Sequence, residues 1–157
     1  AYALALLLEM IQKVDDALNQ YRKVIEMPAD PLILGEACRR LGILLVFTQR
    51  RASEALEPLE RGARLLPGDP GFHYVMGLAY MSMGEMTKAM RALNKIVEFD
   101  PTNALAYAAI ARIYARGNRG NEAAQYYNDA ISLLRLTRGQ GQLPDLPQGT
   151  FDDIDGI

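Results

Sequence analysis

The chain has 157 residues, 50% of them hydrophobic and 23% charged, a composition that excludes a wholly disordered protein. Its 17 basic and 19 acidic residues give a formal net charge of −2, so no overall positive charge attracts nucleic acid. A single cysteine, Cys38, and a single histidine, His73, exclude an intrachain disulfide framework and a cysteine–histidine zinc site. One cysteine leaves the cellular compartment open, and the cytoplasm is the default expectation.

The first residues predict a helix rather than a signal peptide or a membrane span. The apolar stretch from Ala1 to Leu8 ends at Glu9, and no basic region precedes it. It is too short to cross a bilayer, so we expect no membrane insertion. Because the chain begins with Ala inside a helical pattern, we expect it to be a fragment or a processed product.

Small residues recur along the chain with a period of about 34 residues. After one longer first interval, the members of one set recur at a constant interval, and a large residue follows each member four positions later. This set comprises Ala17, Ala55, Ala89 and Ala123, followed by Tyr21, Leu59, Leu93 and Tyr127. A second set comprises Ala5, Gly42, Gly77 and Ala111, followed three positions later by Leu8, Leu45, Tyr80 and Tyr114. Residues three or four apart share a helix face, so the period predicts antiparallel helix pairs that approach closely at the small residues.

The same period predicts where helices begin and end. Two positions before each alanine of the first set stands a residue that favours helix N-caps, because its side-chain oxygen accepts a bond from a free backbone amide. These residues are Asp15, Ser53, Thr87 and Asn121. We therefore expect the second helix of each pair to begin there. Gly84 and the Gly117-Asn118 pair are expected to form the left-handed turns that end the preceding helices.

Four units follow in chain order, at about residues 1–27, 31–68, 70–103 and 104–138. The third carries Met76-Gly77-x-x-Tyr80, Ala89, Leu93 and Pro101, and the fourth carries Ile110-Ala111-x-x-Tyr114, Ala123 and Tyr127. The second carries Leu41-Gly42, Ala55, Leu59 and Pro67, and the first carries Leu4-Ala5, Leu8, Ala17 and Tyr21. This pattern resembles the tetratricopeptide repeat family. The resemblance implies an all-α fold, a right-handed α–α superhelix of about four helical hairpins.

The resemblance also implies a concave groove lined by the first helix of each unit. Its expected peptide-binding residues are Arg39, Ile43, Phe47, Tyr74, Leu78, Met81, Arg112 and Arg116. This lining is apolar in the middle, has arginines at either side and holds few acids, so it suits a peptide with apolar anchors and carboxylates. It lacks the lysine and asparagine ladder of chaperone-associated family members, which argues against a co-chaperone role. The alternative is that these residues pack against each other or against another subunit.

Residues 139–157 differ in composition from the preceding units. The segment contains four glycines and two prolines, and its four aspartates give it a charge of −4 against +2 for residues 1–138. It predicts an irregular acidic tail that ends in Phe151-Asp152-Asp153-Ile154-Asp155. We expect Phe151 and Ile154 to contact an apolar surface in their own chain or a neighbouring one. The alternative is a solvated linker.

No set of residues predicts catalysis. His73 and Cys38 occupy equivalent core-type positions of successive units, which favours packing over a nucleophile or a base. Gly139-x-Gly141 follows a helix and lacks a third glycine, unlike a dinucleotide-binding loop. The basic segment from Arg116 to Gly120 could surround a phosphate, but it falls where a turn is due. We expect no enzymatic activity, no cofactor and no metal.

The pattern therefore predicts a non-catalytic adaptor that binds a protein or peptide segment, its own tail included. One alternative is an assembly subunit that self-associates through its tail or through the uncapped ends of the array. Another is a helical-repeat RNA binder. The small charge of residues 1–138 and the scarcity of polar pairs that could read bases argue against nucleic acid as a partner.

Overall fold

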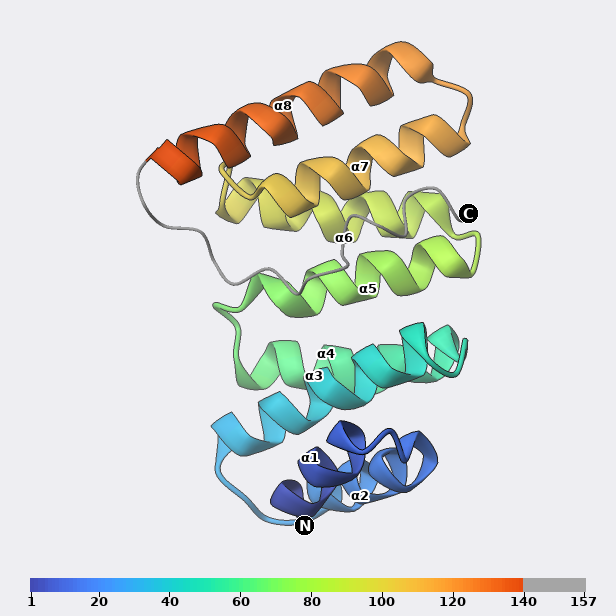
Figure 1. Ribbon diagram of the computed structural model, residues 1–157, viewed down its shortest axis with the longest axis vertical. Helices are drawn as coiled ribbons and strands as arrows, with labels where there is room; N and C mark the ends of the chain where they lie inside the picture. Colours follow the sequence, from blue (N-terminus) through green and yellow to red (C-terminus); the bar gives the residue numbers. More distant parts are fainter. Residues whose placement is uncertain (140–157) are drawn as a thin grey trace.

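The computed structural model describes residues 1–139, which form eight α-helices and, within that range, no strand (Figure 1). The helices are α1 (Tyr2–Met10), α2 (Val14–Glu26), α3 (Pro31–Phe47), α4 (Ala52–Leu65), α5 (Pro70–Ser82), α6 (Met86–Phe99), α7 (Ala104–Arg116) and α8 (Gly120–Gly139). The predicted all-α class is confirmed. The acidic tail, with Phe151 and Ile154, lies outside the described residues.

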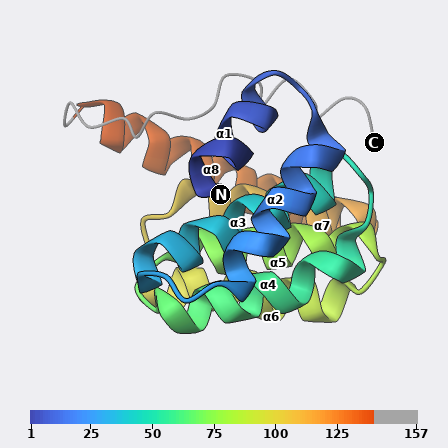
Figure 2. The same cartoon turned by 90° about the horizontal axis from the view of Figure 1, so that it is seen from below.

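Consecutive helices form antiparallel pairs that stack along the long axis of the molecule (Figure 1). Each second helix also contacts the first helix of the next pair, and α5 contacts both α3 and α7 directly. Figure 2 shows α4 and α6 on one side of the stack and α3, α5 and α7 in an adjacent layer. The first helices of the units therefore form a continuous inner layer.

The turn inside each pair contains one residue with a left-handed backbone. These residues are Gln12, Arg50, Gly84 and Asn118, with φ values of 60°, 51°, 78° and 56°. Each stands five positions before one of the aligned alanines, so the turns follow the repeat. The expectation for Gly84 and for the Gly117-Asn118 pair is confirmed. The sequence does not mark Gln12 and Arg50, because both side-chain types rarely adopt this conformation.

The predicted N-caps of the second helices are wrong by about two residues. The caps of α2, α4 and α6 are Lys13, Arg51 and Glu85, and none makes a side-chain capping bond. Asp15, Ser53, Thr87 and Asn121 are each the second residue of their helix. The short turn starts each helix about two residues earlier, because the backbone amide of each cap bonds a carbonyl of the preceding helix, such as Glu85 N to Tyr80 O at 2.9 Å.

Side-chain caps instead begin the first helices of the last three pairs. Asp30 accepts a bond from the Leu32 amide, and Asp69 accepts one from the Gly71 amide, both at 2.8 Å. Asn103 accepts a bond from the Ala106 amide at 3.2 Å. These helices therefore begin where a side chain can satisfy the free amides of the first turn.

Close packing between helices depends on paired large and small residues. Phe72 is fully buried, and a Cβ added to Gly62 would lie 2.2 Å from its ring. The equivalent positions carry the opposite sizes at the next joint, where Ile96 and Ala106 share one core cluster. Within pairs, a Cβ at Gly42 would lie 2.4 Å from Leu59. Small residues are therefore required where two helix backbones approach, but which partner is small varies along the array.

Candidate functional site

A cavity of about 570 Å³ opens at one end of the inner helix layer. It lies between the C-terminal ends of α3, α5 and α7 and the beginning of α4. We call it the arginine pocket, and its lining consists of Val46, Phe47, Arg50, Ala52, Ser53, Leu78, Met81, Ser82, Met83, Arg112 and Arg116. Three successive units contribute to it, so the stacking of the units creates the site.

The floor of the arginine pocket is apolar and its rim is partly exposed. Val46, Leu78 and Met81 are buried in the inner layer. Phe47 and Met83 remain 58% and 42% exposed at the mouth. Large apolar side chains that stay exposed beside a cavity are suited to cover an inserted apolar group.

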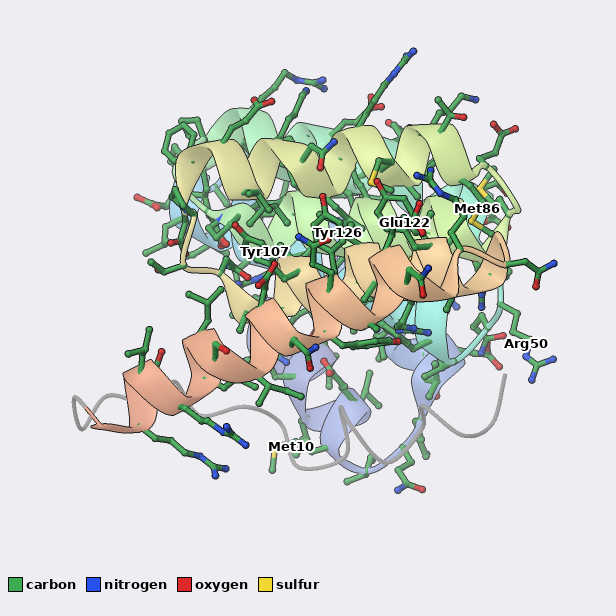
Figure 3. The ribbon with its side chains drawn as sticks, turned by 90° about the horizontal axis from the view of Figure 1, so that it is seen from above. Met10, Arg50, Met86, Tyr107, Glu122 and Tyr126 are labelled. Atoms are coloured by element: carbon green, nitrogen blue, oxygen red, sulfur yellow. The ribbon has the colours of Figure 1, made fainter. Side chains whose placement is uncertain are left out.

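All charged side chains lining this pocket are arginines. The Arg116 guanidinium donates a hydrogen bond to the Met81 backbone carbonyl at 3.2 Å, which holds it against the floor. Within residues 1–139, none of Arg50, Arg112 and Arg116 forms an ion pair, and no carboxylate lines the cavity. Figure 3 places Arg50 at the edge of the molecule, beside the α3–α4 connection. The pocket therefore offers guanidinium groups that are free to pair with an anionic ligand.

Five of the residues expected to line a groove meet in this pocket. They are Phe47, Leu78, Met81, Arg112 and Arg116. Ile43 and Tyr74 lie outside its lining, half-buried against the core. Burial raises the pKa of the Tyr74 hydroxyl, and the nearby Arg112 opposes that shift.

Arg39 has a different setting. Its Nη1 lies 3.1 Å from a carboxylate oxygen of Asp69, and its guanidinium also pairs with Glu36. These contacts connect α3 to the α4–α5 connection, and Arg39 does not line the pocket. Sequence reasoning missed Arg50, whose place one repeat period before Gly84 was the signal that could have found it.

A second cavity, of about 480 Å³, lies between the α4–α5 connection and the end of α6. In the preceding unit Leu66 fills the equivalent space, because a Cβ added to Gly35 would lie 2.5 Å from its Cδ1. Asp100 is the counterpart of Leu66 one repeat later, and it leaves the space open beside Pro70. This cavity has mixed charges, since Lys95, Asp69 and Asp100 all line it.

Cys38 and His73, whose residue types are often used in catalysis, have different settings. His73 is half-buried and lines the second cavity. Cys38 is fully buried, and burial raises the pKa of its thiol. Burial and then the nearby Lys95 lower the pKa of His73. In the part of the chain that the structure describes, no three His, Cys, Asp or Glu residues are grouped so that they could hold a metal ion. Among residues 1–139, no helix combines the length and hydrophobicity needed to cross a membrane.

Comparisons with known proteins agree with the repeat pattern and with the stacked helix pairs. The family model described as tetratricopeptide repeat matches residues 46–113. Residues 46–113, less than half of the chain, therefore carry the tetratricopeptide repeat pattern. The chain is similar to protein CTR9 homolog of Arabidopsis thaliana, with 28% identity over 109 residues. That match covers 68% of this chain but 9% of the relative, so the chain spans about a tenth of the relative's length.

Solved structures of MamA superpose on most of the chain. A crystal structure of MamA matches with a TM-score of 0.76 and 26% identity, covering 87% of this chain and 78% of MamA. A MamA fragment from Desulfovibrio magneticus RS-1 matches with a TM-score of 0.75, covering 86% of this chain and 74% of the fragment. The second is 23% identical and supports the fold alone. Fold and family together place the chain among helical-repeat scaffolds for protein–protein interaction.

Proposed function

We propose that this chain is a non-catalytic scaffold whose inner helix layer binds an apolar-acidic segment of a partner protein. The observation that carries the proposal is the arginine pocket, where three arginines and an apolar floor line one cavity to which residues 1–139 contribute no carboxylate. An acidic segment would supply the missing counter-charges. Apolar side chains next to its carboxylates would cover Phe47 and Met83.

The positions of the arginines support a ligand with closely spaced carboxylates. Arg112 and Arg116 are four residues apart on α7, so they lie on one helix face with Cβ atoms about 5–6 Å apart. Guanidinium groups bind carboxylates through two parallel hydrogen bonds, which gives orientation as well as energy. The apolar floor adds contact area from which water is excluded. A purely acidic or a purely apolar peptide would use only half of this surface.

Selection from a library of displayed random peptides tests the proposal with no partner chosen beforehand. The full chain should enrich peptides in which Asp or Glu stands next to aromatic or aliphatic residues. The Arg112→Glu/Arg116→Glu variant should lose that enrichment, because it places like charges opposite the ligand.

A matched control separates the pocket from overall charge. The Arg91→Glu/Lys95→Glu variant makes the same charge change at the same spacing on α6, outside the arginine pocket. It should keep the enrichment. Equal enrichment by all three proteins, or none by the unmodified chain, would contradict the proposal.

A second candidate function is self-assembly through the ends of the array. Leu4 and Leu7 on α1 are 47% and 54% exposed, and Ile131 and Leu136 on α8 are 45% and 64% exposed. Stacking the α8 end of one copy on the α1 end of another would cover both apolar surfaces. Sedimentation equilibrium over a wide concentration range tests this. A monomer at high concentration, or association unchanged in Leu136→Lys, would contradict it.

A further inference from the structure

The occupant of the arginine pocket can be narrowed to one segment of this chain. We propose that residues 151–155 dock into the arginine pocket of their own molecule and compete there with the partner. This inference rests on the proposed function, because it assigns a ligand and a form of regulation to the same site. It begins from two complementary surfaces, one described by the structure and one given by the sequence.

The segment and the pocket carry opposite charges, and both contain apolar side chains. Residues 151–155 read Phe-Asp-Asp-Ile-Asp, and no lysine or arginine follows Arg138. The pocket has Arg50, Arg112 and Arg116, an apolar floor and no carboxylate from the described part of the chain. Three carboxylates can therefore pair with three guanidinium groups. Phe151 and Ile154 match the exposed rim residues Phe47 and Met83 in character.

Other basic places in the described chain match this segment less well. Arg39 and Arg40 on α3 are already paired with Glu36, and Arg40 also pairs with Glu9. A basic hollow beside α4 and α6 contains Arg64, Arg91 and Lys95, but Glu60 lines it too. A third cavity, between α6 and α7, is lined by Arg91, Arg116 and Arg119 and by no carboxylate of the described residues, but Arg119 is already paired with Glu122. The arginine pocket combines three guanidinium groups that have no ion-pair partner among residues 1–139 with buried apolar surface.

The chain is long enough to make the contact within one molecule. The 20 residues of α8 span about 30 Å, and α8 runs back antiparallel to α7 from a point next to Arg116 (Figure 1). Gly139 therefore lies about 30 Å from the level of the pocket. The 11 residues between Gly139 and Phe151 can extend over about 36–40 Å. Docking within one molecule needs no unfolding of α8.

Tethering makes this contact competitive even if the free segment binds weakly. A short connection gives an effective concentration of roughly 1 mM for the attached ligand. If the free segment binds with a Kd of about 10–100 µM, the tether weakens binding of any competing peptide about 10- to 100-fold. An external peptide should therefore bind poorly until the attached segment is disabled.

Competition in the full-length chain tests the inference. A dye-labelled peptide with the sequence of residues 149–157 is titrated by fluorescence anisotropy with the unmodified chain and with a Phe151→Ala/Asp152→Asn/Asp153→Asn/Ile154→Ala variant. The variant should bind the peptide at least about tenfold more tightly, because its own segment no longer competes. A Leu143→Ala/Asp145→Asn control changes the tail outside the segment and should bind like the unmodified chain.

The possible results separate the inference from the proposed function. Equal affinity for the unmodified chain and the segment variant overturns docking within the molecule, while measurable binding still supports the pocket as a peptide site. If the peptide does not bind to the segment variant, the segment is not a ligand of the pocket. The displayed-peptide selection then tests separately whether the pocket binds another peptide. Tighter binding that persists after Arg112→Glu/Arg116→Glu is added to the variant also overturns the inference, because the peptide then binds elsewhere. If residues 151–155 of one molecule instead held a second molecule in a dimer, docking within one molecule would be overturned.

Discussion

The arginines of α3 and those of α7 are used in opposite ways. Arg39 and Arg40 on α3 are neutralised by carboxylates from their own helix, from α1 and from the α4–α5 connection. Arg112 and Arg116 on α7 have no carboxylate partner among residues 1–139, and both face a cavity. The same residue type, on two helices of the inner layer, therefore forms ion pairs in one region and lacks them, within the described residues, in another.

A small network shows how the first region is held together. Glu9 accepts a hydrogen bond from the Tyr21 hydroxyl at 2.6 Å and lies 3.3 Å from Arg40. Burial, and then the bond to Glu9, raises the pKa of Tyr21. Burial alone would lower the pKa of Arg40, but Glu9 and its other neighbours raise it. Three helices, α1, α2 and α3, are thereby connected through one carboxylate.

The first region is also more tightly packed than the last one. One core cluster extends from Ala5 on α1 to Ala92 on α6, whereas the second covers α5 to α7. The described part of α8 buries only Ala123 and Ala130, and it meets α7 through half-buried tyrosines. Tyr126 lies 6.0 Å from Tyr107 and 5.2 Å from Tyr114 between ring centroids (Figure 3). The first region is well buried and its arginines are paired. The last region is less buried, and its α7 arginines have no ion-pair partner among residues 1–139.

The largest expected effect is a loss of stability at the contact between α4 and α5, in the first region. Phe72→Ala should lower the free energy of unfolding by about 3–5 kcal/mol, because it leaves a cavity against Gly62. Tyr126→Ala, in the α7–α8 interface, should cost about 1–2 kcal/mol, since its ring is half-exposed. Urea unfolding followed by circular dichroism measures both. Equal losses would show that the two regions are packed alike.

A double variant tests whether the large and the small residue at the contact between α4 and α5 can be exchanged. Phe72→Ala combined with Gly62→Ile recreates the pairing of Ala106 with Ile96, and it should recover part of the loss, about 1–2 kcal/mol. A double variant less stable than Phe72→Ala alone would mean that the backbones at the two joints differ too much for the exchange.

The next effect compares the two sets of arginines directly. Arg40→Met should cost about 1–2 kcal/mol, because it leaves Glu9 without its cation beside the buried Tyr21. Arg112→Met should change the free energy of unfolding by less than about 0.5 kcal/mol, because Arg112 has no ion-pair partner to lose within the described chain. Chemical unfolding of both variants in one buffer measures the difference. A cost for Arg112→Met as large as that for Arg40→Met would assign Arg112 a structural role.

A similar or smaller effect concerns the left-handed turns. Arg50→Gly should raise the free energy of unfolding by up to about 1 kcal/mol, because glycine adopts this backbone without strain. Gly84→Ala should lower it by about 1 kcal/mol for the converse reason. Thermal unfolding of the two variants measures the changes. If Arg50→Gly also weakens the binding of an acidic peptide, the Arg50 guanidinium contributes to binding although its backbone is strained.

The smallest expected effect is on pH dependence. Because the pKa of His73 is lowered in the folded state, the unfolded chain binds a proton that the folded chain does not. Stability should therefore rise with pH, up to the ordinary histidine pKa of about 6.5, and fall as the pH drops below that value. His73→Gln should flatten the pH profile of the free energy of unfolding below about pH 6.5. An unchanged profile would show that other groups cause the slope.

The sequence by itself predicted the helix pairs, their period and the small residues at close approaches. These features depend on which residues share a helix face, and that is a local property of the chain. It could not predict the true N-caps of α2, α4 and α6, because backbone hydrogen bonds of the short turns, which residue types do not show, start these helices about two residues earlier. Nor could it distinguish Arg39 from Arg112, which occupy comparable inner-layer positions.

The sequence spacing shows that Arg39 and Arg40 can pair with Glu36 on the same helix, but tertiary structure alone decided their other partners. Arg39 is neutralised by Asp69, 30 residues away, and Arg40 by Glu9, 31 residues away. Arg50 joins Arg112 and Arg116 because a left-handed turn ends α3 beside the inner layer. Ion pairing depends on distances across several helices, which a repeating local pattern leaves unspecified until the units are stacked.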